Sequence, residues 1–286
     1  MRVSIFTMKH ALASAFLAIA GSAYADPVVL SGSFTNPGGS NAGAPAGAGW
    51  YFNNVRNSGV VAVDTSHARS GNGSVSFSGP ANAKADIEFL PNAVPIAGNY
   101  SSGGSLGALS ALSSMSYDWY RDSASAATAG LHPSLRVLID TDGNLLTPGD
   151  RGGLVFERVY NGPAAADDAW ISELISDSTF MWNFGTLLGF GANINASPYA
   201  YDATLAEWKA FFPNASIIGF SSGIGGGWGD FSGAVDNISW TIDGVTTSAN
   251  FETERTAAVP EPGTVALLGL GLLGAGAARW RRGRCH

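Results

Sequence analysis

Short apolar stretches separated by turn residues run through most of the chain, and their pattern predicts β-strands. Residues 74–78 and 85–90 alternate polar and apolar side chains, the period of a strand with one buried face. Residues 60–63 are uniformly apolar, which predicts a buried strand. Five further strands are predicted at residues 115–120, 135–140, 153–160, 215–220 and 235–242. Many short strands between turns predict an all-β fold, a jelly-roll-like β-sandwich, rather than a helical or α/β fold.

One segment has the period of a helix instead. Thr204 and Glu207 have the spacing of a capping box, and Pro213 is expected to end the helix. The apolar positions at helical spacing are Leu205, Trp208, Phe211 and Phe212. We expect one short helix that caps the sandwich. Residues 36–49 have too few large apolar side chains to pack and are expected to form a loop.

The N-terminus has the pattern of a secretory signal peptide. Arg2 and Lys9 make it positively charged, and an apolar segment covers residues 11–20. That segment is too short to span a membrane as a helix. Small residues precede the expected cleavage point between Ala25 and Asp26. The pattern predicts a signal peptide over residues 1–25 and export through the Sec machinery.

The C-terminus carries a second targeting pattern over residues 257–286. A short motif comes first, followed by an apolar run over residues 263–278 and a basic tail over residues 279–286. The motif is Val259, Pro260, Glu261 and Pro262, and the basic residues of the tail are Arg279, Arg281, Arg282 and Arg284. This order resembles the PEP-CTERM protein-sorting signal of exported proteins of Gram-negative bacteria. The resemblance implies recognition by a membrane-embedded exosortase, removal of the tail, and delivery to the cell surface or an exopolysaccharide matrix.

The physical properties of the tail agree with this interpretation. The apolar run is shorter than the roughly 20 residues that span a bilayer comfortably, but flanking arginines can snorkel to extend it. Arginines favour the cytoplasmic side, so we expect a transmembrane sorting helix that tethers a precursor to the inner membrane with the bulk of the protein outside. The alternative is a membrane anchor that is never cleaved.

Composition bounds the part of the chain between the two ends. Residues 26–256 have the length of a single all-β domain. The whole chain has a charge of −7, and without the six basic residues and one acidic residue of the two ends the charge is −12. Such an acidic surface argues against nucleic acid as a partner, because phosphates require Lys and Arg. The only cysteine is Cys285, so this domain has no disulfide.

Two strings in the middle of the chain resemble known extracellular modules. A Gly-rich loop with Trp228, followed by residues 235–238 (Val-Asp-Asn-Ile), resembles jelly-roll modules of bacterial surface proteins. Residues 67–77 resemble an early strand of carbohydrate-binding and laminin-G-like sandwiches. Because small neighbours leave its indole accessible, Trp228 is the main candidate for stacking on a sugar ring. Further aromatic candidates are Trp50, Tyr51, Trp119 and Tyr120.

Oxygen-bearing side chains after one predicted strand form a candidate metal site. Asp140, Asp142 and Asn144 have the i, i+2, i+4 spacing that suits a hard cation such as Ca²⁺. An EF-hand would also need a glutamate at position 151, which is Arg. The alternative is an Asx-rich hairpin whose side chains bond their own backbone. Asp236 likewise is either a metal ligand or a carboxylate that fixes a turn.

Catalytic patterns are weak. Ser105 lies in a G-x-S-x-G string, but it lacks the preceding apolar strand of a nucleophile elbow. The candidate acids Glu88, Glu157 and Glu173 show no recognisable pairing, and the two histidines of the domain, His67 and His132, complete no triad.

The sequence therefore predicts a non-catalytic surface or matrix protein with a structural or adhesive role, in which exopolysaccharide is a candidate ligand. One alternative is a secreted hydrolase that acts on polysaccharide. Another is a membrane-anchored surface domain that binds no small ligand.

Overall fold

The computed structural model describes residues 26–29, 33–35 and 49–253. The expected signal peptide and the sorting segment over residues 257–286 lie outside these ranges. Residues 36–48 of the expected loop lie outside them too. Gly49, which was expected to belong to this loop, is instead the first residue of a strand.

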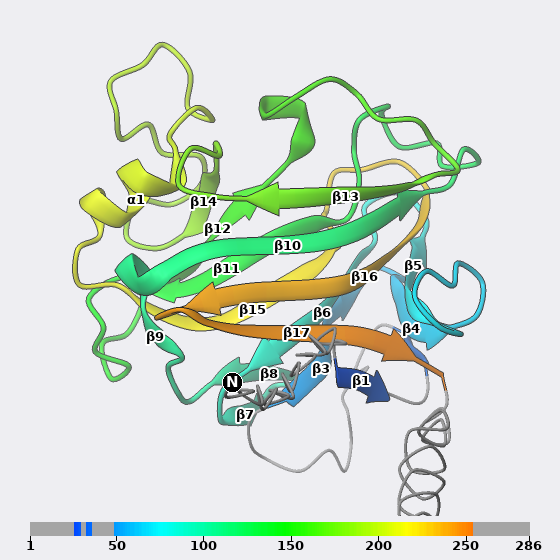
Figure 1. Cartoon of the computed structure of the whole chain (residues 1–286), viewed down its shortest axis with the longest axis horizontal. Coiled ribbons are helices and arrows are strands. Elements are labelled where there is room, and N and C mark those ends of the chain that lie inside the picture. The colour runs from blue at the N-terminus through cyan, green and yellow to red at the C-terminus, as the bar shows by residue number, and fades with distance from the viewer. Residues whose placement is uncertain (1–25, 30–32, 36–48, 254–286) are drawn as a thin grey trace, which may run out of the picture.

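The described residues form two large β-sheets and a small hairpin, which Figure 1 shows with one large sheet in front of the other. The front sheet contains eight strands: β1 (Asp26–Val29), β2 (Ser33–Thr35), β4 (Val60–Asp64), β5 (Ser74–Gly79), β10 (Leu112–Arg121), β13 (Trp170–Ile175), β16 (Phe231–Ile242) and β17 (Val245–Glu252). The second sheet contains seven strands: β3 (Gly49–Arg56), β6 (Lys84–Leu90), β9 (Gly107–Ala108), β11 (Ser134–Asp140), β12 (Arg151–Phe156), β14 (Trp182–Gly185) and β15 (Ser216–Ile224). The hairpin pairs β7 (Ala93–Ile96) with β8 (Asn99–Ser102).

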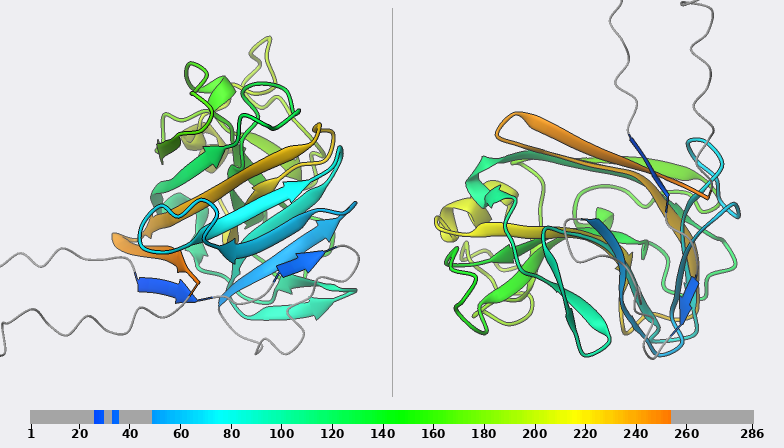
Figure 2. Two further views of the ribbon diagram at one scale, coloured as in Figure 1. Left: turned by 90° about the vertical axis from the view of Figure 1, so that its right-hand side faces the viewer. Right: turned by 90° about the horizontal axis from the view of Figure 1, so that it is seen from below.

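The strand order explains how distant segments meet. In the front sheet, β16 pairs with β10 along one edge, and along its other edge with β5 and then β17. The second sheet runs β14-β12-β11-β15-β6-β3, with every pair antiparallel. Seen from below, the sheets lie as two layers (Figure 2). This arrangement confirms the predicted β-sandwich.

Apolar side chains fill the space between the layers. Trp240 of the front sheet stacks on Phe220 of the second sheet, with ring centroids 4.3 Å apart. Trp50 of β3 packs edge to face against Phe251 of β17 in the same core, with ring centroids 4.9 Å apart. Such aromatic pairs add about 0.5–1.5 kcal/mol beyond the area they bury. Ile87 of β6 points inward into this core. Because alternate residues of a strand point to opposite faces, its neighbours Asp86 and Glu88 point outward, where the site described below lies.

Each predicted strand overlaps a strand of the structure, but the first and last residues differ. Predicted residues 115–120 extend to the ten-residue β10, and predicted residues 235–242 extend to β16. The prediction for residues 153–160 is wrong after Phe156, because a 3₁₀ helix occupies Arg158–Tyr160. A second 3₁₀ helix covers Leu109–Ala111. The sequence analysis did not identify β3, β13, β14 and β17, nor the short strands β1, β2, β7, β8 and β9.

The predicted helix is present as α1 (Leu205–Phe211). Both halves of the capping box form: Glu207 N donates to Thr204 Oγ1 at 3.2 Å, and Thr204 N donates to Glu207 Oε2 at 2.7 Å. Trp208 is fully buried and its indole N–H donates to Met181 O at 2.8 Å. Phe211, expected on the apolar face, is instead exposed. Within the described ranges, no helix is long and apolar enough to cross a membrane.

Candidate functional site

A cleft of about 400 Å³ lies over the outer face of the second sheet. Its floor consists of outward-pointing side chains from neighbouring strands, because alternate residues of a strand point to opposite faces. Asp86 and Glu88 come from β6, Arg136 from β11 and Ser221 from β15, while Glu157 follows β12. Loops after β12, β14 and β15 raise the walls.

A buried ion pair forms the centre of the floor. Arg136 Nη1 lies 2.7 Å from Asp86 Oδ1, and both side chains are almost fully buried. Arg136 also donates to Ser221 Oγ at 3.2 Å and to Gly223 O at 3.1 Å. Asn54 Nδ2 donates to the other Asp86 oxygen at 2.7 Å. Because each charge has several partners, the pair is held in one geometry.

Gly223 makes this ion pair possible. Its strand, β15, lies between the strands that carry Asp86 and Arg136. A Cβ atom at position 223 would lie 2.2 Å from Asp86 Oδ1, a distance that real Cβ atoms do not reach. The absence of a side chain therefore lets the carboxylate cross β15 toward the guanidinium group.

Glu88 is an unusual acid beside this pair. Burial, together with the negative charge of Asp86, raises the pKa of Glu88 to about 7. Asn53 Nδ2 donates to Glu88 Oε2 at 2.5 Å and so limits the rise. Burial also raises the pKa of Glu157, at the same cleft, and the neighbouring Trp182 opposes this rise. Two carboxyl groups with raised pKa values thus face one cleft.

Aromatic rings form one wall of the cleft. Tyr160 and Tyr201 stack with centroids 4.9 Å apart and planes only 6° from parallel. Trp182 of β14 packs against Tyr201 at 6.0 Å and against Phe190 at 4.8 Å. Phe190 is 69% exposed and Tyr160 is 38% exposed. Large rings left accessible in a hollow are a common feature of sites that bind ligands with apolar faces.

Trp228, the main ligand candidate of the sequence analysis, lines the same cleft. It is half-buried and packs against Phe231 with ring centroids 5.2 Å apart. Trp228 follows β15, three strands away from the β14 that carries Trp182. At about 4.8 Å per strand this spacing is about 14 Å, longer than one sugar ring.

The other aromatic candidates lie elsewhere. Trp50, Tyr51 and Trp119 are buried, so we correct their expected role as surface residues that stack on sugar. Their hydrophobic area belongs to the interior, where most large aromatic residues pack. Tyr120 is half-buried and its ring packs on His67 at 4.4 Å, outside the cleft. The sequence analysis did not identify the rings at positions 160, 182, 190 and 201 as ligand candidates. Residues 182, 190 and 201 lie in no predicted strand, and Tyr160 stands at the end of the strand predicted over residues 153–160.

The candidate catalytic residues outside the cleft have surroundings that do not suit catalysis: Ser105 lacks the required turn, and His132 and Glu173 are held by neighbouring side chains. Ser105 is exposed between β8 and β9, without the strand-to-helix turn of a nucleophile elbow. His132 is buried and stacks on Trp119 at 4.2 Å, and burial lowers its pKa to about 4. Glu173 accepts from Arg158 Nη1 at 2.6 Å and from Trp119 Nε1 at 3.2 Å.

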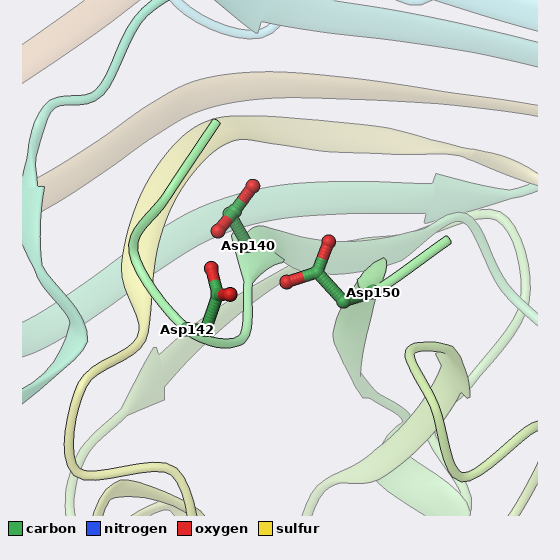
Figure 3. A group of neighbouring side chains, drawn as sticks. All are labelled: Asp140, Asp142 and Asp150. Carbon is green, nitrogen blue, oxygen red and sulfur yellow. The ribbon is translucent and has the colours of Figure 1, made fainter. Parts of the chain in front are cut away.

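The predicted metal residues lie at the turn between β11 and β12. Figure 3 shows the carboxylates of Asp140 and Asp142 converging with that of Asp150, a residue that sequence spacing did not identify. Asn144 Oδ1 accepts from Leu146 N at 3.3 Å in the same turn.

Asp236, the other candidate, lies within β16 and accepts from Phe251 N and from Ser70 N at 3.0 and 3.1 Å. It therefore fixes the backbone of two other segments.

Comparisons with known proteins bear mainly on the C-terminus. Residues 258–282 match the PEP-CTERM protein-sorting motif, which confirms the resemblance noted in the sequence. No curated protein matches the chain.

Similar solved structures are carbohydrate-binding modules. One belongs to the β-sandwich superfamily, with 13% identity and a TM-score of 0.31; the match covers 70% of this chain and spans only 59% of that one. Two are family 11 modules from Clostridium thermocellum. The one in complex with a β-1,3-1,4-mixed-linked tetrasaccharide has 10% identity, a TM-score of 0.36, and coverage of 74% and 96% of the two chains. The one from a cellulosomal cellulase has 12% identity, a TM-score of 0.34, and coverage of 78% and 98%.

Proposed function

We propose that this protein is exported, sorted through its PEP-CTERM signal, and binds polysaccharide of the cell surface or extracellular matrix in the cleft over the second sheet. The signal at residues 258–282 supports the export and sorting part of the proposal. An exosortase recognises the signal while the apolar run tethers the precursor to the inner membrane. The domain over residues 26–256 then remains outside the cell.

The observation that carries the binding proposal is the combination of an aromatic wall with a fixed polar floor in one cleft. Sugar rings offer apolar faces to aromatic side chains and hydroxyl groups to polar ones, and Tyr201 and Arg136 supply one of each kind. Because Arg136 and Asp86 are already fixed by their mutual contact, binding costs little side-chain ordering. Trp228 extends the aromatic contacts across the cleft.

Affinity electrophoresis of the full-length chain in gels that contain the producing organism's purified exopolysaccharide tests this proposal. We expect the wild-type protein to be retarded and Tyr201→Ala to weaken binding about tenfold, as loss of a well-packed aromatic contact does. Tyr199→Ala is the matched control, because Tyr199 is 70% exposed and does not line the cleft. Equal retardation of the two variants would show that the cleft is not the binding site.

A hydrolase acting on polysaccharide is the second candidate, and one observation favours it. Glu88 and Glu157 face the same cleft with raised pKa values, as the acid of a carboxyl pair requires. Binding without catalysis predicts that incubation with the exopolysaccharide releases no new reducing ends. Release of reducing ends by the wild type, and its loss in Glu157→Gln, would establish the hydrolase instead.

A further inference from the structure

The turn between β11 and β12 gathers three carboxylates. Asp140 is the last residue of β11, Asp142 lies in the turn, and Asp150 directly precedes β12. One carboxylate oxygen from each residue lies within 4.8 Å of the other two, and Figure 3 shows the three groups pointing at one another. Three negative charges so close together repel one another unless a positive charge stands among them.

Three of the four carboxylate oxygens of the buried residues Asp140 and Asp150 accept no hydrogen bond, and the fourth, Asp150 Oδ2, accepts from Thr141 Oγ1 at 3.3 Å. Asp140 is 0% exposed and Asp150 is 1% exposed. Neither oxygen of Asp140 accepts a hydrogen bond, and neither does Asp150 Oδ1. Buried carboxylate oxygens that accept no hydrogen bond are costly, and they are rare except where an ion or a proton satisfies them.

Protein cations do not balance the group. Arg151 Nε lies 3.4 Å from Asp140 Oδ2 and is the cation that pairs with the cluster among the described residues. The remaining guanidinium nitrogens of Arg151 donate to Ser102 O at 2.7 Å and to Leu145 O at 2.8 Å. Because Arg151 is a single positive charge and also binds two backbone carbonyl groups, about two of the three negative charges of the aspartates are left uncompensated.

We propose that this turn binds one calcium ion through Asp140, Asp142 and Asp150. Calcium takes oxygen ligands at about 2.3–2.6 Å, so two ligands on opposite sides of the ion are separated by up to about 5 Å. Oxygens that all lie within 4.8 Å of one another can therefore contact one calcium ion together. Magnesium needs shorter distances of about 2.0–2.1 Å and a regular octahedron, and it usually keeps several of its waters.

The turn itself is shaped to hold Asp142 in place. Asp142 Oδ1 accepts from Asn144 N at 2.7 Å, and Oδ2 accepts from Thr147 Oγ1 at 2.9 Å. Gly143 adopts a φ of +74°, and a Cβ atom there would lie 2.6 Å from Asn214 O. The chain thus passes close to a neighbouring loop while the Asp142 carboxylate stays beside those of Asp140 and Asp150.

A bound ion would join the ends of two strands that carry the cleft. Asp140 pairs with Arg151 across the β11–β12 ladder, so Asp140 and Asp150 stand at the turn end of that hairpin. Arg136 lies on the same strand four residues before Asp140, and Glu157 follows β12. Calcium would therefore stabilise the hairpin without itself lying in the cleft.

Calorimetric titration and thermal unfolding of the full-length chain with CaCl₂ after treatment with EDTA test this proposal. We expect one calcium ion per chain, a dissociation constant of about 10⁻⁴–10⁻³ M as in extracellular modules, and a rise in unfolding temperature with calcium. Asp150→Asn should weaken calcium binding about tenfold or more, because it removes a charged ligand. Asp142→Asn should do the same, and since Asp142 is exposed this variant leaves the interior intact.

Asp122→Asn is the matched control. Asp122 follows β10 at the end away from this turn, and the variant keeps the oxygen that accepts from Ala124 N. It should bind calcium as the wild type does. An unfolding temperature that does not respond to calcium would overturn the proposal and indicate a proton shared among the carboxylates. Unchanged affinity in Asp142→Asn would also overturn it, and an equal response to MgCl₂ would overturn the assignment to calcium.

Discussion

At the scale of single residues, Glu88 combines burial with a nearby negative charge. Glu88 is 8% exposed and its side chain lies on the same strand face as that of Asp86. Both effects oppose ionisation, so the folded protein holds the proton of Glu88 more tightly than the unfolded chain does. The consequence is a dependence of stability on pH near neutrality.

The expected sign follows from a pKa raised from 4.5 to about 7 on folding. The stabilising contribution of Glu88 is complete below about pH 4.5 and is lost as the pH rises through about 7, by up to about 3 kcal/mol. Glu88→Gln keeps an oxygen for Asn53 and removes the titration. Urea unfolding at several pH values should show a smaller loss of stability toward pH 8 in this variant. Equal slopes in both proteins would contradict the prediction.

Residue-scale reasoning from sequence found some of the cleft and missed its centre. Trp228 was identified because glycines surround it, and Glu88 and Glu157 were noted as acids. The contact between Arg136 and Asp86 joins residues 50 positions apart, across an intervening strand with a glycine at position 223. No local pattern encodes such a contact, because it depends on the order of strands in the sheet.

At the scale of elements, α1 is the segment whose sequence signals and structure agree most closely. The cap residue Thr204 has extended backbone angles, and its hydroxyl oxygen accepts from Glu207 N. This bond satisfies one of the amides that a helix leaves unpaired at its first turn.

We expect Thr204→Ala to lower the free energy of unfolding by about 1 kcal/mol, because both the hydroxyl acceptor and its contact with Glu207 Oε2 are lost. Thr204→Ser is the control, since serine keeps the hydroxyl and should stay within about 0.5 kcal/mol of the wild type. Chemical denaturation measures both values. A loss of the same size in the serine variant would mean that the methyl group, and not the cap, is responsible.

The strands differ in how far their sequences reveal them. β5 has one covered and one more open face, so its side chains alternate and the period is visible. β6 is buried on both faces, but its period is visible because the residues on its outer face, Asp86 and Glu88, are charged. β3 carries consecutive buried residues, because one face lies against the other sheet and the other lies against the β7–β8 hairpin. β13 has the reverse property, since most of its side chains are partly or fully exposed at the edge of its sheet. In both cases burial on the two faces is too similar to leave a period of two.

At the scale of the whole molecule, the cleft and the acidic turn belong to the same sheet. The hairpin of β11 and β12 bears the three aspartates at its turn, and its strands contribute to the cleft floor. The inner face of the front sheet packs in the core, and the strand residues that line the cleft belong to the second sheet. One sheet thus carries both proposed binding sites, while the sorting signal at residues 258–282 is a separate part of the sequence.

That separation leads to a prediction about the mature protein. If a signal peptidase cuts after Ala25 and an exosortase removes the tail near Val259, protein recovered from the envelope and medium of the producing organism should have an intact mass corresponding to residues 26 to about 259, with or without an attached group. The residues that line the cleft belong to the part that remains after processing, so processing should leave binding to exopolysaccharide unchanged. Replacing Pro260, Glu261 and Pro262 by alanine should block removal of the tail, because the motif that the exosortase reads is lost, while cleavage after Ala25 continues. A wild-type mass that retains residues through His286 would instead show that the apolar run remains as an anchor, and the polysaccharide would then be bound at the membrane surface.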